Sequence, residues 1–136
     1  MSSAGTTWLK YNAAENSQDG AAMNALIDAN LRVTVNGYDA VGSAQDDDRA
    51  MRQLATWYPD YRREVVEVLD FGDRAVVRWR MVGTSQDAET PDLDVHGCSV
   101  IRAASGVISE AHLYYSGAAL DAALEESRKH GEGNRA

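Results

Sequence analysis

Residues 61–84, with the sequence YRREVVEVLDFGDRAVVRWRMVGT, decide the fold of this chain. Two runs rich in β-branched and aromatic residues, 61–70 and 74–84, flank the turn sequence Phe71-Gly72-Asp73. Such runs, separated by a short turn that contains glycine, are typical of a β-hairpin. The stretch therefore predicts two long antiparallel strands.

The alternation in the second strand predicts which side chains face the interior of the protein. Val77, Trp79 and Met81 share one face, because successive side chains of a strand point to opposite sides. Arg78 and Arg80 fall on the other face, where we expect exposure to solvent or a dimer contact rather than ligand binding.

Strand and turn signals continue on both sides of the hairpin. A polar loop at 85–91 leads to further strands, and Pro59 ends a helix before the hairpin. The remaining predicted elements are helices at 7–16, 21–27, 43–57 and 118–129, and strands at 31–35, 93–103 and 107–115. We expect residues 38–44 to form a loop and residues 130–136 to form a frayed tail.

This order of elements predicts the α+β class. Helices that precede a run of long strands are typical of a domain in which the helices pack on one face of a mostly antiparallel sheet. Long sheets coil, so we expect a cone-shaped α+β barrel whose concave interior holds a pocket. With 136 residues, the chain has the length of a single domain, residues 1–136.

Composition and charge exclude several classes of function. The net charge of −8 argues against binding to nucleic acid, which requires clustered Lys and Arg. No apolar run approaches the length of a membrane helix, and no basic segment leads into an apolar run at the N-terminus. Cys98 is the single cysteine, so an intrachain disulfide and a cysteine metal cluster are excluded. These features predict a soluble, cytoplasmic protein.

The helix predicted at 43–57 carries two kinds of side chain. Asp46, Asp47 and Asp48 lie in its first turn, where carboxylates interact favourably with the helix dipole. Met51, Leu54 and Trp57 recur at intervals of three residues and give the helix one apolar face.

Several short motifs occur in an order that resembles the NTF2-like superfamily. Within it, the chain is similar to SnoaL-like polyketide cyclases and ketosteroid isomerase-like proteins, over roughly residues 7–126. The motifs that carry this resemblance are Tyr58-Pro59-Asp60-Tyr61-Arg62, residues 71–79 (FGDRAVVRW), Gly83-Thr84, His96-Gly97, Val100-Ile101-Arg102 and residues 105–110 (SGVISE).

The resemblance implies a cone-shaped pocket for an apolar small molecule, a homodimer, and no metal or organic cofactor. Many members of the family use an acidic residue on the last strand as a general base. At the two positions where relatives carry that residue, this chain has Leu113 and Ser116. Neither side chain can accept a proton in this way, so the usual base is absent from the last strand.

Two residues are candidates for catalysis in its place. His112 lies beside the position of the missing acid, and imidazole suits proton transfer near neutral pH. Strand alternation nevertheless places it on the face opposite to Leu113, where an ordinary sheet histidine is the alternative. Asn36 ends a strand where some cyclase relatives bind a substrate oxygen, but Asn36-Gly37 is also a common turn dipeptide.

The remaining candidates are expected to line the pocket. They are residues of the sheet and of the end of the third helix, with Gly97 and Ser99 turned inward and His96 outward. The predicted ligand-binding residues are Trp57, Tyr61, Trp79, Met81, Ser99, Leu113, Tyr115 and Ser116.

Three functions remain open. The first is a cyclase or isomerase that acts on a polyketide-like natural-product intermediate by pocket shape and hydrogen bonding. The second is a non-catalytic protein that binds a small molecule in the same pocket. The third and weaker alternative is an epoxide hydrolase-like enzyme, which requires two carboxylates and an arginine that together position water.

Overall fold

A computed structural model describes the backbone of residues 3–133 and the side chains of residues 3–129. The helices are α1 (Ala4–Asn16), α2 (Gly20–Ala25), α3 (Ala44–Trp57) and α4 (Ala118–Gly133). The strands are β1 (Ile27–Val35), β2 (Tyr38–Val41), β3 (Arg62–Asp70), β4 (Arg74–Gly83), β5 (Leu93–Ala104) and β6 (Val107–Tyr115).

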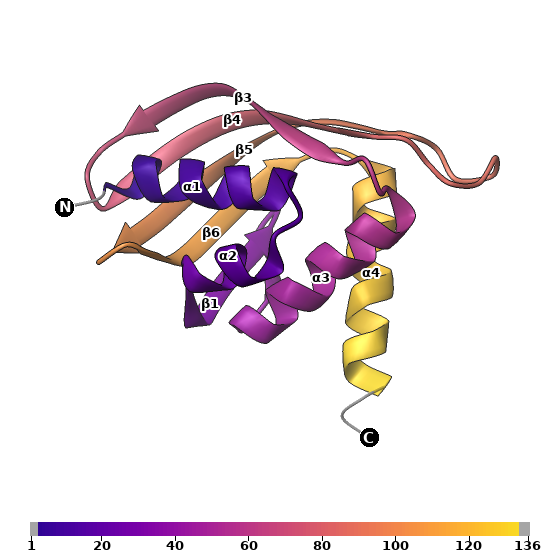
Figure 1. Ribbon diagram of the computed structural model, residues 1–136, viewed down its shortest axis with the longest axis horizontal. Coiled ribbons are helices and arrows are strands. Elements are labelled where there is room, and N and C mark those ends of the chain that lie inside the picture. Colours follow the sequence, from indigo (N-terminus) through magenta and orange to yellow (C-terminus); the bar gives the residue numbers. More distant parts are fainter. Residues whose placement is uncertain (1–2, 134–136) are drawn as a thin grey trace.

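The strands form one curved sheet in the order β2-β1-β6-β5-β4-β3. All neighbouring pairs are antiparallel except β1 and β6, which are parallel. The sheet stays open, with β2 and β3 as its edges, and α1, α2 and α3 lie against its concave side (Figure 1). The predicted α+β class with helices on one face of a curved sheet is confirmed.

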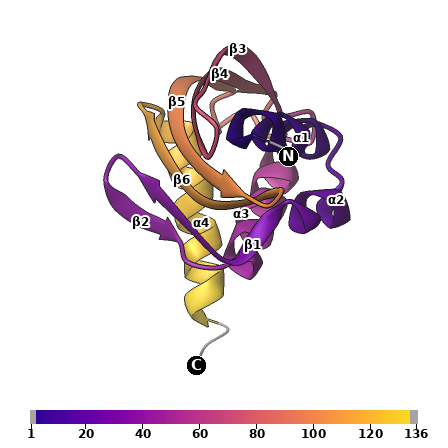
Figure 2. The same ribbon diagram turned by 90° about the vertical axis from the view of Figure 1, so that its left-hand side faces the viewer.

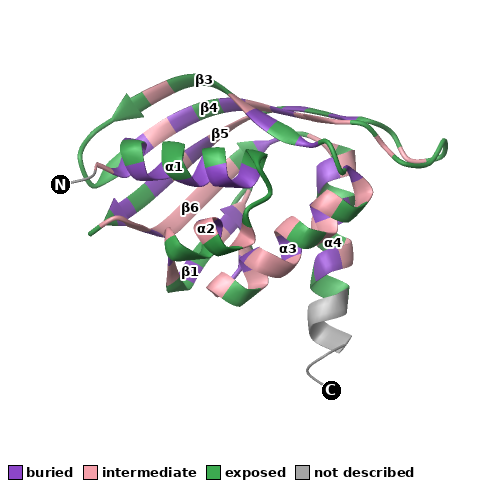
Figure 3. Ribbon diagram, viewed as in Figure 1, coloured by how far each residue is buried: buried purple, intermediate pink, exposed green. Residues whose placement is uncertain are grey.

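The interior lies between the concave face of the sheet and the helices (Figure 3). Val77, Trp79 and Met81 are at most 1% exposed, so the predicted inner face of the hairpin is confirmed. Arg78 and Arg80 lie outside and form ion pairs with carboxylates of the neighbouring strands, Glu67 at 2.8 Å and Asp94 at 2.9 Å. These pairs satisfy both guanidinium groups on the outer surface, away from the interior.

Small polar residues cap the N-termini of three helices. Ser3 accepts a hydrogen bond from the backbone N–H of Thr6, and Asp19 and Ser43 do the same for Ala22 and Asp46. Such caps satisfy N–H groups that have no partner inside the helix. The third helix therefore begins where its sequence predicts.

The expectation of a loop at residues 38–44 is wrong, because Tyr38–Val41 forms strand β2. Asn36 and Gly37 have φ angles of +50° and +89°. Two successive residues with positive φ form a tight turn that matches the twist of a hairpin. The chain therefore returns at once along β1 and widens the sheet by one strand.

Helix α4 stands at one end of the molecule and packs mainly against α3 (Figure 2). Leu120 and Ala123 are its most deeply buried apolar residues, at 3% and 1% exposed. The predicted frayed tail, residues 130–136, falls partly on the end of this helix and partly on residues 134–136, which lie outside the described residues.

Candidate functional site

A cavity of about 80 Å³ lies between the inner face of the sheet and helices α1, α3 and α4. Most of its wall is apolar, whereas four side chains that line it are polar and ionisable: Tyr11, Glu15, Asp47 and Arg63. The apolar wall consists chiefly of Trp8, Ile27, Leu31, Val33, Val35, Val41, Met51, Ile101, Ile108, Ala111, Leu113 and Leu124. An apolar cavity with a few convergent polar groups is the usual form of a small-molecule site.

Tyr11 and Asp47 form the first polar pair of the cavity. The Tyr11 hydroxyl donates a hydrogen bond to Asp47 Oδ2 at 2.7 Å, and both residues are only 7% exposed. The bond joins α1 to the first turn of α3. A buried carboxylate held by a single hydroxyl donor is a candidate for proton transfer.

The surroundings of Asp47 change its affinity for a proton. Burial raises the pKa of its carboxyl from 3.8 to about 6, and the hydrogen bond from Tyr11 limits the rise. Burial and the nearby Asp47 and Glu15 also raise the pKa of Tyr11 well above 10. Near neutral pH, Asp47 can therefore change its protonation state while Tyr11 keeps its proton.

Glu15 and Arg63 form the second polar pair. Arg63 Nη1 donates to Glu15 Oε1 at 2.6 Å, with the two side chains 8% and 0% exposed. The guanidinium also lies over the ring of Trp79, 5.0 Å from its centre. Glu15 Oε2 and Arg63 Nε have no hydrogen-bond partner among the residues that the structure describes. Both side chains therefore retain capacity to bind a polar group in the cavity.

Local sequence rules place these side chains inward. Trp8, Tyr11 and Glu15 are spaced by three and four residues, so they lie on the buried face of α1. Arg63 pairs with Met81 across the β3–β4 ladder, and both residues are buried. The four polar groups thus reach one cavity from α1, α3 and β3.

Two of the predicted ligand-binding residues line this cavity. Ser99 and Leu113 contribute to its wall from β5 and β6. Trp79 lies behind Ser99 and donates a hydrogen bond from Nε1 to its hydroxyl at 2.9 Å. Met81 is 1% exposed in the core, and neither Trp79 nor Met81 is part of the cavity lining.

Four other predicted ligand-binding residues lie away from the cavity. Tyr61 lines a separate groove between α2 and α3, and Tyr115 lines another between β2 and α4. Trp57 packs half-buried at the end of α3, and Ser116 is exposed. Tyr61 and Tyr115 are buried and Trp57 is half-buried, but none of the three lines the cavity.

His112 lies on the outer face of β6. Its neighbours Ala111 and Leu113 line the cavity, so alternation turns His112 away from it. The imidazole Nδ1 is 2.8 Å from Thr34 Oγ1, and Nε2 is 3.4 Å from Glu110 Oε2. The sheet therefore separates this predicted catalytic residue from the cavity.

The side chain of Asn36, the other predicted catalytic residue, forms hydrogen bonds with the backbone and does not line the cavity. Its side-chain amide donates to the carbonyl oxygen of Tyr115 at 2.8 Å and accepts from the N–H of Tyr115 at 3.1 Å. The amide thus acts as an additional strand residue that joins the end of β1 to the end of β6. Its turn geometry supports the alternative that Asn36 is a turn residue.

The sequence contained signals for the polar residues that the predictions missed. Glu15 follows Tyr11 by four residues, which places it on the same helix face as the apolar residues. Arg63 follows Tyr61 by two residues in a strand, so it shares the inward face predicted for Tyr61. No sequence pattern singles out Asp47, because it is one of three consecutive aspartates in the first turn of α3. Which of the three is buried depends on how the helices pack.

Two further findings concern the described residues only. No group of three or more His, Cys, Asp or Glu side chains there is arranged to hold a metal ion. None of the helices in the part of the chain that the structure describes is long and apolar enough to cross a membrane.

Comparison with solved structures identifies the fold. The chain resembles a protein with a ketosteroid isomerase-like fold from Catenulispora acidiphila, in complex with trimethylamine, with a TM-score of 0.72 and 14% identity over 88% of this chain and 92% of that chain. A protein from Jannaschia sp., proposed to be a SnoaL-like polyketide cyclase, gives 0.67 and 20% over 85% of both chains. AclR from Streptomyces galilaeus, proposed to be a hydroxylase, gives 0.70 and 18% over 88% and 82%.

Comparison of sequences identifies the family. No functionally curated protein matches the chain. The family model described as a SnoaL-like domain matches residues 8–111, which include all four polar residues of the cavity. Because this match covers most of the sequence and the fold agrees with it, the chain belongs to the SnoaL-like family.

Proposed function

We propose that this protein is a small-molecule enzyme of the cyclase or isomerase type, in which Asp47 is the general base and Tyr11 is its partner. The observation that carries the proposal is a buried carboxylate, with a pKa of about 6, in an apolar cavity. A base works best when its pKa lies near the working pH. Asp47 would thus perform on α3 the role of the acid that is absent from both customary positions of the last strand.

The proposed reaction begins with a proton next to a carbonyl group. Asp47 takes this proton, and the electrons of the broken C–H bond move to the carbonyl oxygen. Once Asp47 is neutral, the Tyr11 hydroxyl turns from it and donates its hydrogen bond to the resulting enolate. An isomerase would return the proton from Asp47 to another carbon of the substrate. In a cyclase the enolate carbon would instead attack a second carbonyl group and close the ring, and Asp47 would give its proton to the alkoxide that forms.

Exchange of carbon-bound protons provides a direct test. Butanone in D₂O, monitored by NMR, should gain deuterium next to its carbonyl group faster with the protein than in buffer. Asp47→Asn should lower this rate by about a hundredfold or more, because it removes the base and retains the shape. His112→Ala is the matched variant on the outer face and should leave the rate unchanged. Loss of exchange with His112→Ala and not with Asp47→Asn would refute the assignment.

The geometry also favours a second candidate, opening of an epoxide by water. Glu15, Arg63 and Asp47 bring two carboxylates and an arginine to one cavity. In this reaction Glu15 would accept a proton from the attacking water, a C–O bond of the epoxide would break, and protonated Asp47 would give its proton to the ring oxygen. Incubation with propylene oxide and measurement of the diol distinguishes the two reactions, because only this candidate forms a diol.

Binding without chemistry is the other outcome that these assays recognise. Leu113 and Ser116 replace the acid at both customary positions on the last strand, which is the observation in its favour. A ligand that binds the cavity and is recovered unchanged, with no deuterium exchange and no diol, would establish a binding protein.

We also propose that the protein forms a homodimer through the outer face of its sheet. Leu69 and Tyr114 are large apolar side chains of this face, and they are 46% and 50% exposed. A two-fold contact would cover such residues on both copies. Light scattering at micromolar concentration should give twice the monomer mass, and a monomer mass would refute the dimer.

A further inference from the structure

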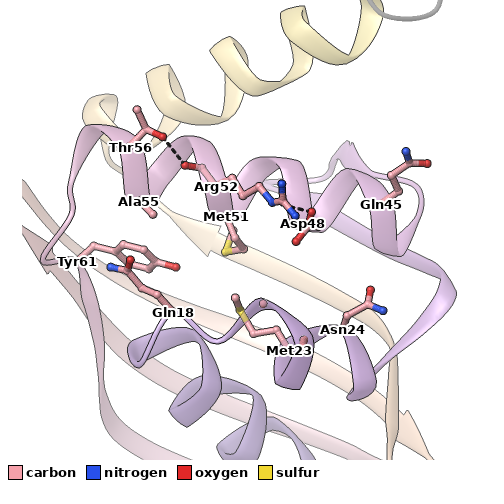
Figure 4. A pocket seen from close by; sticks show the side chains of 12 residues that line it. Gln18, Met23, Asn24, Gln45, Asp48, Met51, Arg52, Ala55, Thr56 and Tyr61 are labelled. Carbon is pink, nitrogen blue, oxygen red and sulfur yellow. Dashed lines mark hydrogen bonds and ion pairs between the residues drawn. The ribbon is translucent and has the colours of Figure 1, made fainter.

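A large groove opens between α2 and α3 on the surface beside the cavity (Figure 4). Its volume is about 960 Å³, and amide and hydroxyl side chains are among the residues that line it. Met23 from α2 and Met51 from α3 point toward one another there, with Tyr61 at one side (Figure 4). The groove is thus far larger than the cavity.

A third, very small space shares lining residues with both the groove and the cavity. Its volume is about 10 Å³, and its lining includes Met23, Met51 and the Asp47 side chain. Met51 also lines both the groove and the cavity. The small space therefore lies between the groove and the cavity, and Met23, Met51 and Asp47 share its wall.

We propose that Met23 and Met51 form the gate of the cavity, and that the groove between α2 and α3 is an outer subsite for the distal part of the ligand. The reacting end passes the gate to reach Asp47, while the rest of the molecule stays in the groove. The proposal rests on the proposed function, because it assigns the reacting end to Asp47. Methionine suits a gate, since its unbranched side chain changes conformation easily.

The sizes of the two spaces determine what kind of ligand they take together. A cavity of about 80 Å³ is smaller than the 300–1,000 Å³ usual for a whole ligand, so it holds only a small end group. The groove offers the amides of Asn24 and Gln45 and the hydroxyl of Thr56. Asp48 and Arg52 neutralise each other there at 2.9 Å. The ligand is therefore an elongated, uncharged molecule with a small carbonyl end and an oxygenated tail.

A rival entrance exists on the side of β2 and α4. That groove, of about 580 Å³, shares Val35, Ala40, Val41, Ala50 and Leu124 with the cavity. These shared residues are all apolar, and Asp47 does not line that groove. The passage past the methionines is favoured because Asp47 lines it.

NMR titration tests the route without any need for turnover. The probes are butanone and a long-chain methyl ketone with hydroxyl groups along its tail. Both should shift the signals of Leu113 and Val33 in the cavity, whereas only the long ketone should also shift the side-chain amides of Asn24 and Gln45. Met51→Trp should weaken binding of the long ketone by about tenfold or more, while Met51→Leu, which keeps the volume, should bind as the unaltered chain does.

Glu125→Trp is the matched variant for the rival entrance, because Glu125 lines that groove and not the cavity, and it should leave binding unchanged. The proposal is overturned if Glu125→Trp blocks the long ketone, if Gly42 and Asp121 of the rival groove shift in place of Asn24 and Gln45, or if neither ketone reaches the cavity. If the shifts follow the predicted pattern but butanone gains no deuterium, the gate and the subsite stand and the proposed chemistry fails.

Discussion

The hydroxyl of Tyr11 on α1 donates a hydrogen bond of 2.7 Å to the carboxylate of Asp47 on α3. The two residues are 36 positions apart in the sequence, and both are buried. This contact joins two of the three helices on the concave side of the sheet and gives the apolar cavity a titratable group. The chemistry proposed for the protein depends on it.

Tyr11→Phe should change the pH dependence of catalysis. The hydrogen bond from Tyr11 lowers the pKa of Asp47, so its loss should raise that pKa further above about 6. The rate of deuterium exchange should increase with pH as Asp47 loses its proton. In Tyr11→Phe the midpoint of this increase should therefore move to a higher pH. We expect a loss of about tenfold to a hundredfold at neutral pH. Tyr38→Phe, at an exposed tyrosine of β2, is the control, and an unchanged pH profile for Tyr11→Phe would contradict the pairing.

Asp47→Asn should stabilise the protein at high pH. Folding raises the pKa of Asp47 from 3.8 to about 6, so the folded state binds this proton more tightly than the unfolded state. The associated stability is present below pH 4 and is lost as the pH rises to 6. The shift corresponds to about 3 kcal/mol, which is an upper value for the gain in unfolding free energy of Asp47→Asn at pH 8. Urea unfolding at pH 4 and pH 8 measures it, and an equal effect at both pH values would contradict the buried charge.

The sequence predicted the architecture better than the site, for a physical reason. Strand alternation and helix caps act over a few residues, so the burial of Trp79 and the start of α3 at Ser43 followed from local rules. The site depends on which helix packs beside which, and no local pattern distinguishes Asp47 from Asp46. His112 was predicted because it lies beside the position of the missing base on the last strand. The carboxylate of the cavity instead comes from helix α3.

Removing one charge of the Glu15–Arg63 pair should destabilise the protein more than replacing both side chains with apolar ones. Glu15→Gln leaves the buried guanidinium without its counter-charge, and we expect a loss of about 3–5 kcal/mol. The double variant Glu15→Leu with Arg63→Met removes both charges and should recover much of that loss, because apolar side chains fit this environment. Urea unfolding of the single and double variants gives the coupling. Additive losses would show that the two side chains act independently.

Asn36 should prove to be a structural residue. Asn36→Gly permits the positive φ of the turn but removes both hydrogen bonds to Tyr115, so it should lower stability by about 1–3 kcal/mol. Asn36→Ala loses the same bonds and also strains the turn, so it should be less stable than Asn36→Gly. Thermal unfolding orders the two variants, while the rate of deuterium exchange in the folded protein should match that of the unaltered chain for both. A large fall in that rate in a variant that still folds would contradict this assignment. It would show that the contact of Asn36 between β1 and β6 is needed for catalysis as well as for the sheet.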